Sequence, residues 1–367
     1  MSITILPMRL QLITLPKASL YGIMQPVVKN LFFREKASFF SYTENALEVS
    51  IIADVDTVQH DFAAVSCPGL IICADPFRAM QVDSDSGYGL DNSAQRINEI
   101  SSPLAKAGVS IFYLSTYQTD YVFVKERRMS LVISTLQAHD FHFFDLDDLD
   151  LDCTPPTTPA AGAPTYSDAT YSSSSPTRNI LHTPFTALSG MDSSPSSPSN
   201  PKSSTSSSDD ALLQNGKFIA RKLIPRYTVR LVGLNREYID TWALSLVKVF
   251  FYEETLTPSS QSSPHSAEPP VAGRFFNYTA TEEGISVIAD EGLLEVFPEH
   301  ILNTSASLKA LKCIQVDLSD YGLDRCGIVY SMSEPLARSQ IDLLYVSTYT
   351  TANILVKCTH TPHAVSF

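Results

Sequence analysis

Residues that could bind a metal or act as nucleophiles are few and scattered. "CTHTPH" near the C-terminus brings Cys358, His360 and His363 together, and zinc accepts both side-chain types. The group lacks the paired spacing of a structural zinc site and lies at a chain end. We therefore expect no metal here.

Motifs of the common enzyme classes are missing. "GYGLD" contains G-x-G but no third glycine at the position that a dinucleotide fingerprint requires. Neither a nucleophile elbow nor a phosphate-binding loop occurs, and His139 and His142 have no partner motif for acid–base work. The sequence predicts a protein that is not an enzyme and needs no cofactor.

Two loops that precede predicted helices contain a glycine and an aspartate, in "YGLDNS" and "YGLDRC". Gly89 and Gly322 could bring backbone N–H groups close to a ligand, and a helix N-terminus favours a carboxylate. The alternative is that Asp91 and Asp324 simply cap the helices.

The chain is an internal repeat, and this is its strongest signal. "FFSYT" at 39–43 recurs as "FFNYT" at 275–279, which is 236 positions later, and "STY" recurs from Ser115 to Ser347, which is 232 positions later. Within the second match, Asp120 of the first copy corresponds to Ala352 of the second copy.

Periodicity predicts strands and helices in the same order in both halves. The predicted strands are 9–15, 38–43, 47–53, 69–74, 109–116, 121–124 and 141–144, then 228–233, 275–279, 285–289, 310–316, 343–348 and 353–357; the predicted helices are 18–32, 92–107 and 129–138, then 238–252 and 326–339.

This order predicts the α+β ferredoxin-like class, with β-α-β-β-α-β units whose helices cover one face of an antiparallel sheet. We expect four such domains in two tandem pairs, the last of them short because only "CTHTPHAVSF" follows Lys357. The predicted boundaries are 1–67, 68–146, 216–307 with a loop insert at 256–272, and 308–367.

Residues 147–215 are rich in Ser, Thr, Pro and Asp, a composition that predicts a disordered linker. Six hydroxyl residues in it precede proline and are candidate phosphorylation sites, with a passive spacer as the equal alternative. They are Thr154, Thr158, Ser175, Thr183, Ser194 and Ser197.

Composition limits the partners. A formal net charge of -13 argues against nucleic acid and anionic membrane surfaces. No apolar run is long enough for a membrane span, the N-terminus lacks a signal-peptide pattern, and six cysteines without C-x-x-C spacing suggest free thiols. We expect a cytoplasmic protein.

Three features together resemble a known family: the duplicated units, "PLAKAGVSIFYLSTYQTDYVFVKE" from Pro103, and "YGLDRCGIV" from Tyr321. They are similar to the CASTOR family, cytosolic arginine sensors made of four ACT domains. The resemblance covers the chain apart from the linker and the insert. It implies a non-enzymatic protein that binds an amino acid between its second and fourth ACT domains and acts on TOR complex 1 through the GATOR2 complex.

The resemblance also implies site residues. Ligand-binding positions of the family fall on Ser110, Ile111, Gly322, Arg325, Thr348, Tyr349 and Ala352; partner-binding positions fall on Tyr117, Gln118 and Asp120; homodimer positions fall on Val247 and Tyr252.

Two of these positions depart from the family pattern. Arg325 stands where the family has an acidic residue, and Ala352 stands where it has the aspartate that receives the guanidinium. A guanidinium enclosed without a carboxylate loses charge-assisted hydrogen bonds. Arginine is therefore a doubtful ligand, and we expect a neutral or acidic amino acid, or no ligand. The alternative function is a regulatory subunit of an amino-acid biosynthetic enzyme, since ACT pairs commonly control such enzymes.

Overall fold

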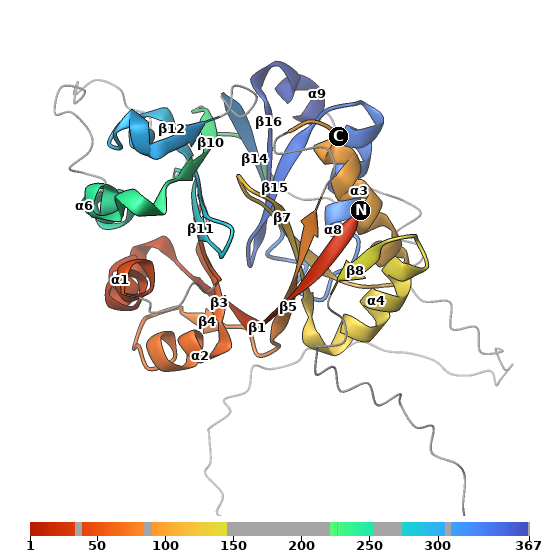
Figure 1. Ribbon diagram of the computed structural model, residues 1–367, viewed down its shortest axis with the longest axis horizontal. Helices are drawn as coiled ribbons and strands as arrows, with labels where there is room; N and C mark the ends of the chain where they lie inside the picture. The colour runs from red at the N-terminus through yellow and green to blue at the C-terminus, as the bar shows by residue number, and fades with distance from the viewer. Residues whose placement is uncertain are drawn as a thin grey trace, which may run out of the picture. The chain divides into compact units, whose positions relative to one another are not determined.

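A computed structural model describes residues 1–33, 39–83, 90–144, 221–225, 227–252, 274–304 and 310–365. These residues belong to one compact unit that comprises Met1–Leu151 and Asn215–Phe367 (Figure 1). The predicted linker with its six phosphorylation candidates, the predicted insert and Gly89 lie outside the described residues.

The first half folds into two modules in the predicted element order. The first module contains β1 (Ser2–Leu15), η1 (Lys17–Ile23), α1 (Met24–Phe32), β2 (Phe40–Glu44), β3 (Val49–Asp54), α2 (Val55–Thr57), η2 (Val58–Phe62) and β4 (Ile71–Ile72). The second contains β5 (Phe77–Asp83), α3 (Ser93–Lys106), β6 (Ile111–Ser115), β7 (Asp120–Lys125), η3 (Glu126–Arg128), α4 (Met129–Gln137) and β8 (His142–Phe144).

The second half repeats this order in a third and a fourth module. The third contains β10 (Val229–Leu234), η5 (Arg236–Tyr238), α6 (Ile239–Phe251), β11 (Phe276–Ala280), β12 (Ile285–Asp290), α7 (Glu291–Leu294), η7 (Glu299–Ile301) and β13 (Leu302–Thr304). The fourth contains β14 (Leu311–Asp317), α8 (Ile328–Arg338), β15 (Leu343–Ser347), β16 (Thr351–Lys357), η9 (Cys358–His360) and α9 (Thr361–Val365), and β9 (Lys222–Leu223) pairs with its first strand.

Edge strands join the modules into one sheet. β2 pairs with β11, so that Tyr42 lies opposite Tyr278, and β6 pairs with β15 at Leu114 and Val346. β1 continues from the first module into the second because its N-terminal part pairs with β5. A contact between β10 and β14 completes a closed, barrel-like sheet.

Both faces of this sheet are buried. Figure 1 shows α1 and α6 at the left of the closed sheet and α3 and α8 at its right, so that all four helices lie against its outer face. Trp242 and Val27 belong to the core under α1 and α6, while Ile97 and Leu336 belong to the core under α3 and α8. A third core, which includes Phe123, fills the space between the inner faces of the strands. The expectation that helices would cover one face is confirmed, and the other face is covered by the facing strands.

One predicted strand is wrong. The segment 69–74 contains only the short, largely exposed β4, and the buried strand that begins the second module is β5, at Phe77–Asp83. The charge of Arg78 obscured the strand pattern. In the structure this side chain pairs with Glu126 and donates to the carbonyl of Pro7 at 2.6 Å, which allows it to be buried.

The fourth module has a last helix. η9 and α9 follow β16, at the place where η3 and α4 follow β7 in the second module. The expected truncation therefore concerns helix length: α9 is five residues long and α4 is nine.

Candidate functional site

The second and fourth modules meet around two matched serines. Ser347 Oγ accepts a hydrogen bond from the backbone N–H of Tyr113 at 2.9 Å, and Ser115 Oγ accepts one from Tyr345 at 3.1 Å. The rings of Tyr113 and Tyr345 meet edge to face, with centroids 6.3 Å apart, and α3 packs against α8. This contact positions the loop between β14 and α8.

That loop brings three of the predicted ligand residues together. Ser110 Oγ donates to the carbonyl of Leu323 at 2.8 Å, and Gly322 adopts φ +68°, which favours glycine. The guanidinium of Arg325 lies over the ring of Tyr321, 5.8 Å from its centroid. The predicted residue Ile111 is half-buried at the start of β6, directly after Ser110.

Ion pairs tie the same loop to β7. The ammonium group of Lys125 lies 2.7 Å from an Asp324 oxygen and 2.6 Å from an Asp75 oxygen, and Arg127 approaches Asp324 at 3.2 Å. Burial alone would lower the pKa of Lys125, but the two carboxylates raise it above its ordinary value. The hydrogen bond from Lys125 in turn lowers the pKa of Asp75.

These contacts correct the capping alternative. α8 begins at Ile328 after Gly327 at φ +80°, so Asp324 lies ahead of the cap and binds Lys125 instead. α3 begins after Asn92, which has φ 59°, and Asp91 precedes that cap. In both loops a left-handed residue between the aspartate and the helix moves the aspartate away from the cap.

Thr348 and Tyr349 lie at the turn between β15 and β16, against the first module, and Ala352 is the second residue of β16. Thr348 Oγ1 donates to Glu48 Oε1 at 2.7 Å, and the backbone N–H of Tyr349 donates to Ser50 Oγ at 3.3 Å. Ala352 is buried in the core under α3 and α8. The Thr348 hydroxyl is thus engaged by the protein itself.

The predicted partner-binding residues lie at the matching turn between β6 and β7, against the third module. The backbone N–H of Tyr117 donates to Ser286 Oγ at 3.0 Å, and Gln118 Nε2 faces the carbonyl of Ile285 at 3.5 Å. Asp120 is buried and pairs with Arg96 at 3.4 Å. Tyr117 and Gln118 are half-buried, so only part of each side chain faces outward.

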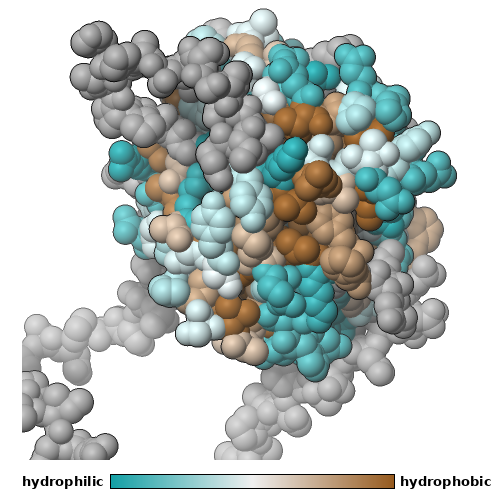
Figure 2. Space-filling view, turned by 90° about the vertical axis from the view of Figure 1, so that its left-hand side faces the viewer, coloured by the Kyte–Doolittle hydropathy of each residue, from teal (hydrophilic) through white to brown (hydrophobic). Residues whose placement is uncertain are grey.

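The predicted homodimer residues lie on α6 and at its end. Val247 is half-buried against the core under α1 and α6, and the side chain of Tyr252 is 40% exposed. Figure 2 shows hydrophobic surface gathered on the side of the molecule that carries α1 and α6. Exposed apolar side chains on or beside these helices are Tyr21 on η1, Phe33 directly after α1, and Leu244 on α6.

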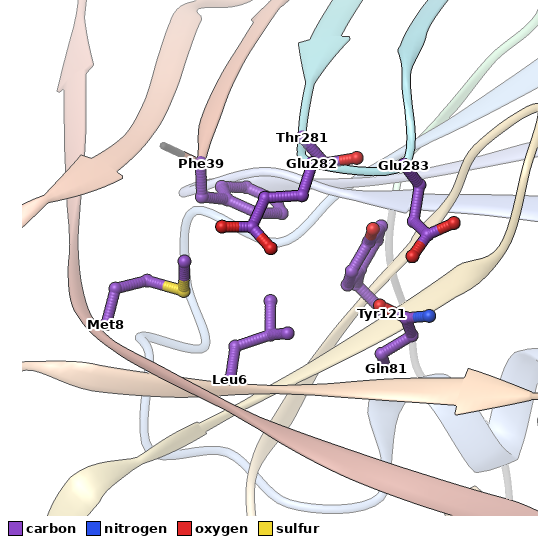
Figure 3. Close-up of a pocket in the computed structure, with 8 residues that line it drawn as sticks. All are labelled: Leu6, Met8, Phe39, Gln81, Tyr121, Thr281, Glu282 and Glu283. Atoms are coloured by element: carbon purple, nitrogen blue, oxygen red, sulfur yellow. The ribbon is translucent and has the colours of Figure 1, made fainter. Parts of the chain in front are cut away.

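A small cavity of about 30 Å³ lies elsewhere, where β1, β5 and β7 meet the turn between β11 and β12. In Figure 3, the Glu282 carboxylate points toward Leu6, beneath the ring of Phe39. Burial, followed by the charge of Glu283, raises the pKa of Tyr121 to about 12 despite a hydrogen bond with Thr281. None of the predicted ligand residues lines this cavity.

Two residues that hold the site were not predicted. Glu48 accepts bonds from both Thr348 and the backbone N–H of Thr350, at 2.7 Å each. Lys125 holds Asp324, and a lysine as the last residue of an otherwise apolar strand end was the one available signal for it. No sequence signal pointed to Glu48, because Thr348, the residue that it holds, lies 300 positions away.

Comparisons with known proteins place this arrangement in a family. An ACT-domain family model matches residues 72–138 and 307–367, which are the second and fourth modules. The human "Cytosolic arginine sensor for mTORC1 subunit 1" is 26% identical over 361 residues, covering 97% of this chain and 94% of that protein. The mouse protein of that name is 25% identical with 97% and 93% coverage.

A shorter human relative, "Putative protein CASTOR3P", is 32% identical over 114 residues, which are 29% of this chain and 67% of that protein. The chain belongs to the CASTOR family. The predicted resemblance is thereby confirmed, and the second and fourth modules are ACT domains.

Among solved structures, the aspartate kinase from Synechocystis matches with 10% identity and a TM-score of 0.32, covering 100% of this chain and 54% of that one. In the part of the chain that the structure describes, no helix could cross a bilayer. Within the same residues, no three His, Cys, Asp or Glu side chains gather as metal ligands would.

Proposed function

We propose that this CASTOR-family chain is a non-enzymatic, cytoplasmic amino-acid sensor with four ACT domains, bounded as the sequence predicts and joined by the 147–215 linker. The observation that carries the proposal is the likeness to named arginine sensors along 97% of the chain. The contact between the second and fourth modules supports it, because the β14–α8 loop there is hydrogen-bonded to Ser110.

The ligand is a neutral or acidic amino acid bound at this loop. Gly322 leaves the backbone accessible, and Arg325 supplies a positive charge in place of a carboxylate. Ala352 offers no acceptor to a guanidinium, which argues against tight arginine binding. A ligand here has to compete with the bonds that Ser110 and Asp324 already make within the chain.

A thermal-shift screen of the twenty amino acids tests the ligand. A ligand present at one hundred times its Kd adds about 2.7 kcal/mol of stability, which raises Tm visibly. We expect a shift with a neutral or acidic amino acid that Arg325→Ala weakens. A shift with arginine alone would refute the proposed ligand class, and no shift with any amino acid would refute the sensor function.

The partner is a GATOR2-type complex acting on TOR complex 1 signalling. The half-buried Tyr117 and Gln118 of the β6–β7 turn form part of the contact surface. The buried Asp120, which begins β7, supports that turn. A pull-down should recover GATOR2-type subunits with the wild type and lose them with a Tyr117→Ala/Gln118→Ala double variant. If the wild type recovers no GATOR2-type subunits in an assay where a named arginine sensor recovers them, this part of the proposal is refuted.

The chain forms a homodimer through the face of α1 and α6. Leu244 is 65% exposed and Tyr252 is 40% exposed on that face, which favours burial against a second copy. Leu244→Asp should shift the protein to a monomer in sedimentation analysis, and Leu131→Asp on the exposed side of α4 should not. A wild type that sediments as a monomer contradicts this claim.

A further inference from the structure

Arg96 on α3 has no charged counterpart in the repeat. The position 232 residues later is Ile328 on α8, and the same spacing relates Asp120 on β7 to Ala352 on β16. The first copy therefore has an arginine and an aspartate where the second copy has two apolar residues. The two positions differ together, as expected for side chains that depend on each other.

The guanidinium of Arg96 is enclosed by acceptors. One terminal nitrogen lies 3.4 Å from an Asp120 oxygen, and the other donates to the backbone carbonyl of Asp91 at 2.8 Å. The side chains of Arg96 and Asp120 are 11% and 8% exposed. A planar guanidinium can satisfy acceptors in two directions, which a lysine ammonium does less well.

The fourth module completes the surroundings. Burial raises the pKa of Asp342, which directly precedes β15, while the charges of Lys357 and then Arg96 oppose that rise. Ser93, one turn before Arg96 on α3, accepts a hydrogen bond from the backbone N–H of Leu343 at 3.0 Å. The guanidinium therefore lies where α3 and β7 of the second module meet the fourth.

We propose that Asp120 and the carbonyl of Asp91 form a guanidinium-binding site whose occupant is the chain's own Arg96. The guanidinium that pairs with Asp120 thus comes from the second module itself. This part of the contact between the second and fourth modules needs no free ligand. The site is separate from the loop that holds Ser110 and Gly322, and the proposal does not depend on the proposed sensor function.

Chemical rescue tests the proposal. Arg96→Ala removes a group of the size and shape of ethylguanidinium and leaves Asp120 without its cation. We expect Tm to fall by about 5 °C or more, because breaking a buried ion pair is costly. Ethylguanidinium at about 10 mM, far below denaturing concentrations, should restore much of that loss and leave the wild type unchanged.

Matched controls separate a guanidinium site from a general charge effect. Ethylammonium should rescue Arg96→Ala poorly, and ethylguanidinium should not rescue Arg96→Ala/Asp120→Asn, which lacks the carboxylate. Arg127→Ala removes an exposed arginine near the end of β7 and should give no response. Equal rescue by ethylammonium, or equal rescue of the double variant, would overturn the proposal.

A second variant keeps the test decisive if Arg96→Ala does not fold. Arg96→Lys retains the charge and fills the space, so its Tm should lie below that of the wild type and should not respond to ethylguanidinium. A Tm equal to that of the wild type would show that the planar group is unnecessary and would overturn the proposal.

Discussion

Two equivalent hairpins each receive a turn from the other half of the chain. The β2–β3 hairpin binds the β15–β16 turn through Ser50, and the β11–β12 hairpin binds the β6–β7 turn through Ser286. In both contacts the serine accepts a backbone N–H bond from a tyrosine, Tyr349 or Tyr117. The repeat therefore conserves the backbone contact.

The side chains around these contacts differ. Glu44 and Glu48 of the first hairpin are both buried, and the equivalent positions of the second hairpin are Ala280 and Gly284. Glu48 accepts bonds from the turn that it holds. At Gly284 the hairpin has no side chain of its own, and the end of the Gln118 side chain from the turn fills the space where a β-carbon would lie.

One contact is thus fixed by the buried carboxylate of Glu48, and the other is fitted by shape around Gly284. Charge-assisted hydrogen bonds are about twice as strong as neutral ones, so the first contact should be the more rigid. The shape-fitted contact carries Tyr117 and Gln118, the proposed partner residues. Stability and partner recognition should therefore respond to different substitutions.

The largest expected effect is at the buried end of the first hairpin. Arg274 lies 2.6 Å from Glu44, whose side chain is 2% exposed and also pairs with Lys17. Arg274→Ala should lower the free energy of unfolding by about 3 kcal/mol, because it leaves the buried Glu44 carboxylate with Lys17, whose side chain is 31% exposed, as its cation. Urea denaturation measures this. Arg230→Ala, at a pair with an exposed carboxylate, is the control and should change little.

The same pair predicts a pH dependence. Burial alone would raise the pKa of Glu44, but Arg274 and Lys17 outweigh it and hold the pKa below its ordinary value. Its stabilisation is then complete above the unfolded pKa of about 4.3 and is lost as pH falls through the folded pKa. The stability difference between wild type and Glu44→Gln should narrow below about pH 4. A stability difference between wild type and Glu44→Gln that stays the same at every pH would contradict this prediction.

Glu48→Ala should have the next largest effect. It leaves the N–H of Thr350 and the hydroxyl of Thr14 without their acceptor, which should cost about 2–3 kcal/mol in denaturant unfolding. The control is Glu283→Ala, the exposed neighbour of Gly284, which should stay within about 0.5 kcal/mol of wild type. Equal losses in both variants would remove the contrast between the hairpins.

Gly284→Ala should have a smaller effect on stability, about 1–2 kcal/mol, because the flexible end of Gln118 can move away but a φ of +156° is strained for alanine. Gly284→Ala should also reduce recovery of the GATOR2-type subunits in the pull-down, because it displaces the Gln118 side chain. A double-mutant cycle measures the coupling. Adding Gly284→Ala to Gln118→Ala should cost less than Gly284→Ala costs in the wild type, because only the backbone strain at φ +156° remains. An additive result would show that the two residues do not touch.

The smallest effect is expected at the ion pairs of the β14–α8 loop. Asp324 is 74% exposed, so Asp324→Asn should cost about 1 kcal/mol or less, and salt should reduce that cost. Thermal unfolding at low and high salt tests this. A cost that does not change with salt would mean that the loop depends on contacts other than these charges.

Local pattern predicted most elements but missed one strand. α3 and α4 were predicted within two residues, because apolar side chains at helical spacing face the core. β5 was missed because a buried Arg78 needs partners that lie far away in the sequence. The position of Asp324 was predicted, but its role was not, since Lys125 comes from another module.

The sequence by itself determined the repeat, the order of elements and the family, because these depend on residue types and on spacing along the chain. Only the tertiary structure decided that β10 meets β14, that Glu48 holds Thr348, and that Arg96 lies beside Asp120. Such contacts depend on which edges and side chains approach in space. Two copies with the same elements can therefore surround equivalent turns with different chemistry.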